Sequence, residues 1–286
     1  MTKPVRAGDA AVVVIVQNDA ETIERSIASY YDHVDRILVS TDPCRGFSGA
    51  PITPDDTLGL IRALDRDRKI TIVEADFYKF DEPMRNETHQ REEAARLLCE
   101  EAAPRWIFQV DADEVFLDFP AVLRQVMRQP FARAVFWRWI SIFNILPDGR
   151  LLVIVDEDGS PILERFPLAH RPPVKLKSGR LADKPSDAIF KVFKWRYEGG
   201  LRRTDAVLHY SYAKSEARIR EKLSTFGHSR EFDRDRFYDL WLSSKTDWAG
   251  IKNFHPLTPD TWPALRAFTI DELSVFTGGQ GTLTGK

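Results

Sequence analysis

The sequence predicts an α/β fold with a doubly wound, mostly parallel central sheet flanked by helices. Four short apolar runs rich in β-branched residues occur along the first part of the chain, and amphipathic helical patterns separate them. Such alternation is typical of parallel strands joined by right-handed crossovers. The 286 residues are 43% hydrophobic and 29% charged, which suffices for a sizeable core and a polar surface.

Each element of the first part follows from its own pattern. The run Val12–Val16 contains no polar residue, which is typical of a strand buried on both faces. Strands are expected at Val12–Val16, Arg36–Ser40, Lys69–Val73 and Trp106–Val110. Three helices are expected between these strands. The first follows Asp19, a plausible cap, and has Ile23, Ile27, Tyr30 and Tyr31 at helical spacing. The second lies around Leu58, Ile61 and Leu64, and the third covers Glu87–Ala102 and ends before Pro104. A long loop, rich in Pro and Gly, is expected at Thr41–Asp55.

The second part has a different character, with apolar runs separated by turns rich in Pro and Gly. This pattern predicts a smaller antiparallel part followed by C-terminal helices. Strands are expected at Phe131–Asn144, Arg150–Val155 and Ala188–Trp195, helices at Ala213–Glu231 and Pro259–Phe268, and a disordered tail at Thr277–Lys286.

Charge and composition exclude several classes of protein. The chain has 41 Lys and Arg against 43 Asp and Glu, a net charge of -2, which argues against a general nucleic-acid binder. Residues 1–10 lack the apolar stretch of a secretory signal, and no apolar run is long enough for a membrane helix. The two cysteines, Cys44 and Cys99, do not form a disulfide framework. We therefore expect a cytoplasmic protein.

Two carboxylates, Asp111 and Asp113, follow the fourth predicted strand in the segment Asp-Ala-Asp-Glu. Open α/β sheets bind ligands at the carboxyl ends of their strands, and alternate residues of an extended chain point the same way. The two acids can therefore converge on one divalent cation, and hard oxygen ligands suit Mg²⁺ or Mn²⁺. The alternative interpretation is that they only cap a turn.

The order of these motifs resembles that of GT-A glycosyltransferases of the family-2-like group. The resemblance covers roughly residues 10–120 and a later block around His209. Its motifs are Asn18-Asp19 after the first strand, Asp42 near the end of the second, Gln90-Arg91 before the fourth, Asp111-Ala112-Asp113-Glu114, and Leu208-His209-Tyr210-Ser211-Tyr212 followed by Lys214 and Lys222. Glu92 departs from the pattern, because the group often has Asn there.

The resemblance implies a GT-A fold and a metal-dependent, inverting glycosyltransferase. The donor would be a nucleotide-diphosphate sugar, most simply a UDP-sugar, and the acceptor a neutral or anionic saccharide, as in surface polysaccharide or lipopolysaccharide synthesis. Residues 1–130 would bind the donor and residues 131–286 the acceptor within one continuous domain, with at most peripheral membrane contact. The implied metal ligands are Asp111, Asp113 and His209, and the implied donor contacts are Asn18, Asp19, Asp42, Arg91 and Asp111.

An inverting enzyme needs a carboxylate that deprotonates the acceptor hydroxyl. The candidates are Asp187, Glu198 and Glu114, although Glu114 could equally orient the metal ligands.

The segment 165–203 also attracts attention, because it holds eleven Lys and Arg, Arg180 among them, against three acids. It is either a solvated basic face or a site for an anion. Trp137, Trp139 and Trp195 could stack on acceptor sugars or pack in the core. His89, His170, His228 and His255 show no ligand spacing and are expected to be structural.

Three other functions fit parts of the sequence. A haloacid-dehalogenase-type phosphatase would use Asp111 as nucleophile and Asp113 as acid/base, but that motif usually lies on the first strand. A nucleotidyltransferase would share the fold, yet Gln17-Asn18-Asp19-Ala20 contains no glycine. A carbohydrate- or nucleotide-binding protein without catalysis is the third alternative.

Overall fold

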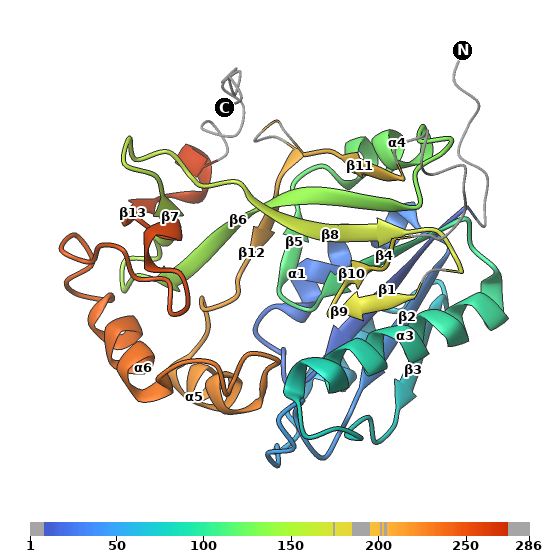
Figure 1. Ribbon diagram of the computed structural model, residues 1–286, viewed down its shortest axis with the longest axis horizontal. Coiled ribbons are helices and arrows are strands. Elements are labelled where there is room, and N and C mark those ends of the chain that lie inside the picture. The colour runs from blue at the N-terminus through green and yellow to red at the C-terminus, as the bar shows by residue number, and fades with distance from the viewer. Residues whose placement is uncertain (1–8, 174, 185–194, 201, 203–204, 274–286) are drawn as a thin grey trace.

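The computed structural model has an α/β architecture built on one large sheet with helices on both faces of its parallel half (Figure 1). It describes residues 9–173, 175–184, 195–200, 202 and 205–273. Within these residues, the main path of the sheet runs β13-β7-β6-β8-β4-β1-β2-β3. The predicted fold class is confirmed.

The parallel half of the sheet consists of the four strands predicted from the sequence. They are β1 (Ala10–Val16), β2 (Arg36–Thr41), β3 (Ile70–Glu74) and β4 (Trp106–Asp111), and the pairings among these four strands are all parallel. Every residue of β1 is buried, as its unbroken apolar run predicts. Val12 and Val14 pack into the core on one face of the sheet, and Val13 packs into the core on the other.

Helices cover both faces of this half. Helices α1 (Ile23–Ala28), α2 (Thr57–Leu64) and α4 (Phe119–Met127) contribute buried residues to the core that contains Val12. On the opposite face lies α3 (Pro83–Ala102), whose Ala94 and Leu98 pack against Val13. Helix α3 begins four residues earlier than predicted, at a proline, and this residue suits the first turn because its missing N–H has no helical partner there.

The second half extends the sheet beyond β4 with strands of both directions. Strand β8 (Glu164–His170) pairs antiparallel with β4 and with β6 (Ala134–Ile145), and β7 (Leu151–Val155) continues the sheet. Four more strands and two helices complete this half: β5 (Glu114–Phe116), β11 (Arg196–Glu198), β12 (Val207–His209), β13 (Ala264–Phe268), α5 (Glu216–Thr225) and α6 (Arg234–Ser243). Figure 1 shows β12 between β5 and β6, and it pairs with both. Strands β9 (Leu176–Ser178) and β10 (Leu181–Ala182) form a separate hairpin.

The helix predicted at Pro259–Phe268 is wrong. A short 3₁₀ helix occupies Pro259–Thr261, and the chain then forms β13, which pairs antiparallel with β7. The physical reason is Pro263, which disfavours helical backbone at the residue before it, and Trp262 is accordingly non-helical. The apolar residues Leu265 and Phe268 therefore serve a sheet and not a helix face.

Three other predictions need correction or fall outside the described residues. The helix predicted at Ala213–Glu231 covers only Glu216–Thr225, because Phe226 adopts extended backbone. Asp19 does not cap α1, since Thr22 occupies the N-cap position. Of the strand predicted at Ala188–Trp195, only Trp195 is described, and it precedes β11; the tail Thr277–Lys286 also lies outside the described residues.

The loop between β2 and α2 rests on the C-terminal end of α5. The Ser48 backbone N–H donates to the Thr225 carbonyl (3.1 Å), and the Ser48 hydroxyl donates to the Ser224 carbonyl (2.6 Å). A Cβ atom at Gly46 would lie 2.4 Å from Thr225 Cβ, so only glycine allows this close approach. Residues far apart in the sequence are thereby held together beside the strand ends.

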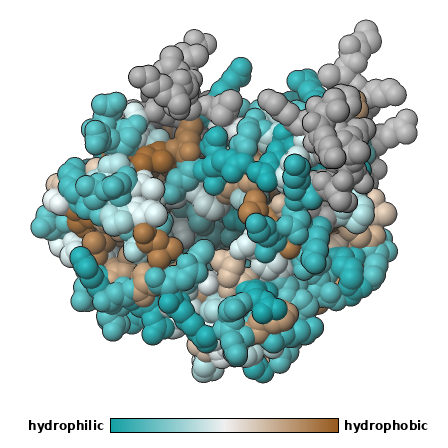
Figure 2. Space-filling view, in the orientation of Figure 1, coloured by the Kyte–Doolittle hydropathy of each residue, from teal (hydrophilic) through white to brown (hydrophobic). Residues whose placement is uncertain are grey.

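The face of the molecule seen in Figure 2 is mainly hydrophilic, with hydrophobic residues exposed in scattered places. None of the helices in the described part of the chain has the length and apolar character needed to cross a membrane.

Candidate functional site

A cavity of about 600 Å³ opens at the carboxyl ends of β1 and β4. After β1 the chain builds β2 and β3 on one side and then returns to place β4 on the other side, so β1 and β4 flank a topological switch point. Open α/β sheets bind ligands at such points. The cavity is lined there by Asn18 and Asp19 after β1, and by Asp111 and Asp113 at the end of β4. The sequence correctly predicted that these residues come together.

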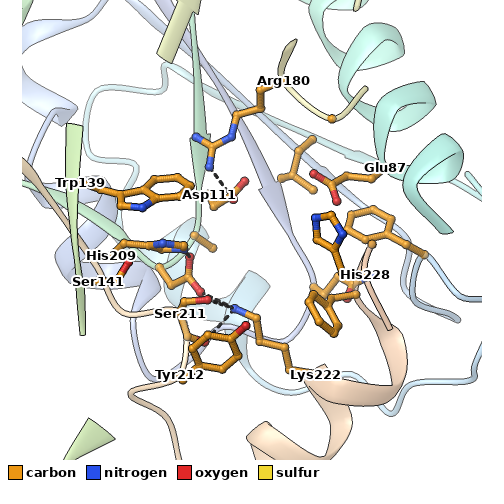
Figure 3. Close-up of a pocket in the computed structure, with 18 of the residues that line it drawn as sticks. Glu87, Asp111, Trp139, Ser141, Arg180, His209, Ser211, Tyr212, Lys222 and His228 are labelled. Carbon is orange, nitrogen blue, oxygen red and sulfur yellow. Dashed lines mark hydrogen bonds and ion pairs between the residues drawn. The ribbon is translucent and has the colours of Figure 1, made fainter. Parts of the chain in front are cut away.

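Asp111 is held between two arginines, of which Figure 3 shows Arg180. Its Oδ1 accepts a hydrogen bond from Arg91 Nη2 (2.6 Å), and its Oδ2 accepts one from Arg180 Nη2 (2.9 Å). Burial alone would raise the pKa of this carboxyl, but the guanidinium groups of Arg180 and Arg91 lower it to about 2. Asp111 is therefore ionised at neutral pH.

Arg180 reaches the site from the turn between β9 and β10 and forms a buried ion pair with Glu114. The Glu114 side chain has 0% exposure, and its oxygens accept from Arg180 Nη2 (2.6 Å) and Nη1 (3.0 Å). Burial raises the pKa of Glu114, and Arg180 opposes that shift. The hairpin is tied to α3, because Glu92 accepts from the Leu176 N–H (2.8 Å) and Thr88 accepts from the Gly179 N–H (2.7 Å). Glu92, which stands where the glycosyltransferase group often has Asn, thus helps to hold the hairpin against α3.

Asp113 is surrounded by cations from the second half of the chain. Its Oδ2 lies 3.0 Å from Lys222 Nζ on α5 and 3.3 Å from Lys214 Nζ in the preceding loop. Its Oδ1 lies 3.4 Å from His209 Nε2 on β12. Burial would raise the pKa of Asp113, but the two lysines and His209 hold it well below its usual range. Lys214 also contacts Asp19 (2.8 Å), which joins the ends of β1 and β4.

One group of side chains at this cavity could bind a metal ion: Asp111 and His209 line the cavity, and Glu114 is fully buried beside them. Ligand atoms of Asp111, Glu114 and His209 lie within 4.8 Å of one another, and two carboxylates with an imidazole are a suitable donor set. This cluster contains Glu114 in place of the predicted Asp113. Both carboxylates already accept hydrogen bonds from Arg180, so a bound ion would share them with a guanidinium. The residues present thus fit a metal, although the cluster leaves its identity open.

One nitrogen of Arg91 has no hydrogen-bond partner within the described part of the chain. Its side chain is 3% exposed, its Nη2 pairs with Glu87 and Asp111, and its buried Nη1 has no hydrogen-bond partner among the described residues. A buried guanidinium N–H without an acceptor is costly. Because Arg91 lines the cavity, an anionic ligand could supply the missing acceptor.

The remaining predicted site residues lie elsewhere. Asp42 is buried outside the cavity lining, and its carboxylate accepts the backbone N–H groups of Cys44 (2.9 Å), Arg45 (3.1 Å) and Phe77 (3.2 Å). Glu198 pairs with Arg165 and lines a second cavity. Asp187 lies outside the described residues. Their predicted roles stay predictions.

Of the tryptophan and histidine residues considered from the sequence, some line the main cavity and others lie in the core. Trp139 lines the main cavity, whereas Trp137 and Trp195 are buried in the core. His228 and His255 also line the cavity, although the sequence suggested only structural roles.

Three acids that line the cavity were not predicted as site residues: Glu87, Glu164 and Glu221, the last of them on α5. Glu87 lies one turn before Arg91 on α3, and Glu164 begins β8. For Glu87, the spacing of four residues from Arg91 was an available signal. Strand β8 contains Pro167 and charged residues, so no apolar alternation marked it or Glu164.

Comparisons with known proteins give only distant similarities. No protein-family model matches the chain, and no curated protein does. Among solved structures, it is similar to S. aureus TarS 1-349 (13% identity over 46% of this chain and 36% of that chain, TM-score 0.34). It is also similar to 4-diphosphocytidyl-2C-methyl-D-erythritolsynthase from Anaerococcus prevotii DSM 20548 (11% identity over 69% of this chain and 89% of that chain, TM-score 0.38). A second S. aureus TarS structure is similar at 11% identity over 83% of this chain and 42% of that chain, with a TM-score of 0.34. The chain spans less than half the length of either TarS structure, and similarity at this level does not assign an activity.

The buried ion pair gives a stability prediction. Arg180→Met should lower the free energy of unfolding by about 3–5 kcal/mol, because it leaves the Glu114 charge buried without a partner. Adding Glu114→Gln should recover much of that loss, since the unpaired charge is then gone. Urea denaturation of the two single variants and the double variant measures the coupling, and additive effects would contradict a direct pair.

The placement of Asp42 gives a second prediction. Asp42→Asn should cost about 1–3 kcal/mol of stability, because the new amide group cannot accept the Phe77 N–H. Urea denaturation measures the loss. Thr71→Val, at a hydroxyl that bonds only the exposed Glu101, serves as a surface control and should change stability by less than about 0.5 kcal/mol. Unchanged stability of Asp42→Asn would show that the carboxylate does not hold this loop.

Proposed function

We propose that this protein is a glycosyltransferase that moves a sugar from a nucleotide-diphosphate sugar to a saccharide acceptor. The observation that carries the proposal is the meeting of acids and cations at the switch point of the sheet. Asp111 and Asp113 lie there with Arg91, Lys214 and Lys222, which come from three separate segments. A nucleotide diphosphate needs fixed positive charge at such a strand edge, and the cavity offers it.

The cations would act on the leaving group. When the bond between sugar C1 and the diphosphate oxygen breaks, its electron pair stays on the diphosphate and negative charge grows there. The ammonium groups of Lys214 and Lys222 and the Nη1 of Arg91 would donate hydrogen bonds to the diphosphate oxygens and so stabilise this charge. Asn18 and Asp19 would line the donor pocket at the end of β1.

Asp111 and His209, with Glu114 or Asp113, would hold Mn²⁺ or Mg²⁺, which when bound neutralises diphosphate charge. In the same proposal residues 1–130 bind the donor, residues 131–286 bind the acceptor, and the donor is a UDP-sugar. The protein would act in the cytoplasm, with at most peripheral membrane contact, in surface polysaccharide or lipopolysaccharide synthesis.

Nucleotide binding tests this proposal directly. UDP, GDP and dTDP are titrated with and without Mn²⁺ while the thermal unfolding midpoint is followed. One of them, UDP in our proposal, should raise the midpoint, because a ligand that binds only the folded state stabilises it. Lys222→Met should weaken that binding at least tenfold, which corresponds to about 1.4 kcal/mol. Lys252→Met, at an exposed position outside the cavity, is the matched control and should bind like the wild type.

Two results would count against the proposed function. If none of the three nucleotides shifts the midpoint, the cavity is not a nucleotide-diphosphate site. If the wild type instead hydrolyses p-nitrophenyl phosphate and Asp111→Asn abolishes that activity, the phosphatase alternative replaces it.

A further inference from the structure

The strand register places Glu164 on the same side of the sheet as the acidic motif. In the β6–β8 pairing Trp139 lies opposite Glu164, and in the β6–β12 pairing Ser141 lies opposite His209. His209 in turn lies opposite Glu114 in the β12–β5 pairing. Because paired residues share a face and side chains alternate along a strand, these five side chains form one row across four strands. Figure 3 shows Trp139, Ser141 and His209 together on one wall of the cavity.

Three neutral donors hold the Glu164 carboxylate in place. Trp139 Nε1 donates to Oε2 (3.0 Å), the Ser141 hydroxyl donates to the same oxygen, and Trp262 Nε1 donates to Oε1 (2.7 Å). Two oxygens offer about four acceptor positions, so at least one position stays open for a further donor. Glu164 is half-buried and lines the cavity, so a ligand can reach that position.

Among the described acids that line the cavity, Glu164 differs from all others in its charge environment. Each of the others lies within ion-pair distance of an Arg or Lys: Asp19, Glu87, Asp111, Asp113 and Glu221. Glu164 has no Arg or Lys at that distance within the described part of the chain. The open position on Glu164 is therefore not occupied by a charged side chain of the described residues and is left for a ligand.

We propose that Glu164 is the catalytic base that removes the proton from the acceptor hydroxyl. This inference rests on the function proposed above, and it names the group that the reaction needs at the acceptor side. The candidates suggested by the sequence are placed less well: Glu114 is fully buried and paired with Arg180, and Glu198 lies in another cavity.

The step balances without a further reactant. The acceptor O–H proton passes to the open position on the Glu164 carboxylate. The acceptor oxygen forms a bond to sugar C1 from the side opposite the diphosphate, and the C1–O bond breaks with its electron pair on the diphosphate. The sugar configuration at C1 is therefore inverted, and Glu164 ends as a carboxylic acid that returns its proton to water.

The surroundings of Glu164 suit a hydroxyl-rich acceptor. Trp139, Trp262 and Tyr212 line the same part of the cavity, and aromatic faces are good contact surfaces for the C–H groups of a sugar ring. His255 packs edge-on against Trp262 (ring centroids 4.4 Å), and Trp139 packs against His209 (4.3 Å). Trp139 therefore contacts both Glu164 and His209, and it links the acceptor side of the cavity to the side that holds Asp111 and Asp113.

Donor hydrolysis tests the base, because water is the simplest acceptor whose O–H must be deprotonated. The probe is the donor among UDP-glucose, UDP-galactose and UDP-N-acetylglucosamine that most raises the unfolding midpoint of the wild type. Glu164→Gln should lower kcat for UDP release at least 100-fold, with KM for the donor and the UDP-induced midpoint shift within twofold of wild type. Nuclear magnetic resonance of the released sugar should show the inverted anomer.

Glu157→Gln, at an exposed turn outside the cavity, is the matched control and should keep the wild-type kcat. If Glu164→Gln does not fold, Glu164→Asp replaces it, and its retained carboxylate should give a kcat between those of wild type and background.

The outcomes separate the two proposals. No midpoint shift with any donor or with UDP, GDP or dTDP would overturn the proposed function itself. UDP binding with a wild-type kcat in Glu164→Gln would overturn the base assignment alone. A released sugar of retained configuration would also overturn the base assignment. So would a wild-type protein that binds the donor without releasing UDP. A lowered midpoint in Glu164→Gln with unchanged kcat would show that Glu164 only supports the two indoles.

Discussion

The ion pair between Glu114 and Arg180 is the interaction on which the rest of the site depends. Two charges removed from water are tolerated only when each meets a partner with good geometry. Glu114 is fixed by the β5–β12 pairing, so Arg180 must come to it, and the hairpin that carries Arg180 must stay docked on α3. The same guanidinium then holds Asp111. Through Arg180, the buried Glu114 thereby holds the β9–β10 hairpin against α3 and fixes the position of Asp111.

The site as a whole is a nearly balanced array of charges assembled from both halves of the chain. Asp19, Asp111 and Asp113 alternate in space with Arg91, Arg180, Lys214 and Lys222. A net charge of -2 for the whole chain therefore hides strong local fields of both signs. An entering anion and its counter-ion would exchange partners with groups that are already paired with one another.

Sequence patterns predicted the local elements and failed where distant segments determine the structure. Strand β1 is an unbroken apolar run and β2 to β4 each contain a short one, and the position of Asp111 and Asp113 follows from the chain order alone. Strands β5 and β12 have only three residues each, and β8 contains a proline, so no period distinguishes them. The contacts of Arg180 and Glu164 arise from the register of such strands and from a docked hairpin, which a local pattern does not encode. Pro263 was the one available signal against the helix predicted at Pro259–Phe268.

The place of β8 and β12 in the sheet has a consequence for how the protein is made. During synthesis the first four strands and their helices leave the ribosome as a unit, but one edge of β4 has no partner until β8 emerges. Strand β5 lacks its hydrogen-bonding partner for longer, because β12 comes from a later segment of the chain. Until then the nascent chain carries an open sheet edge beside an incomplete cluster of acids. Strands β8 and β12 close the edge, and the charges around Asp113 are complete only after Lys222 is added. A truncated product would be prone to aggregate and would lack the charges that complete the cavity.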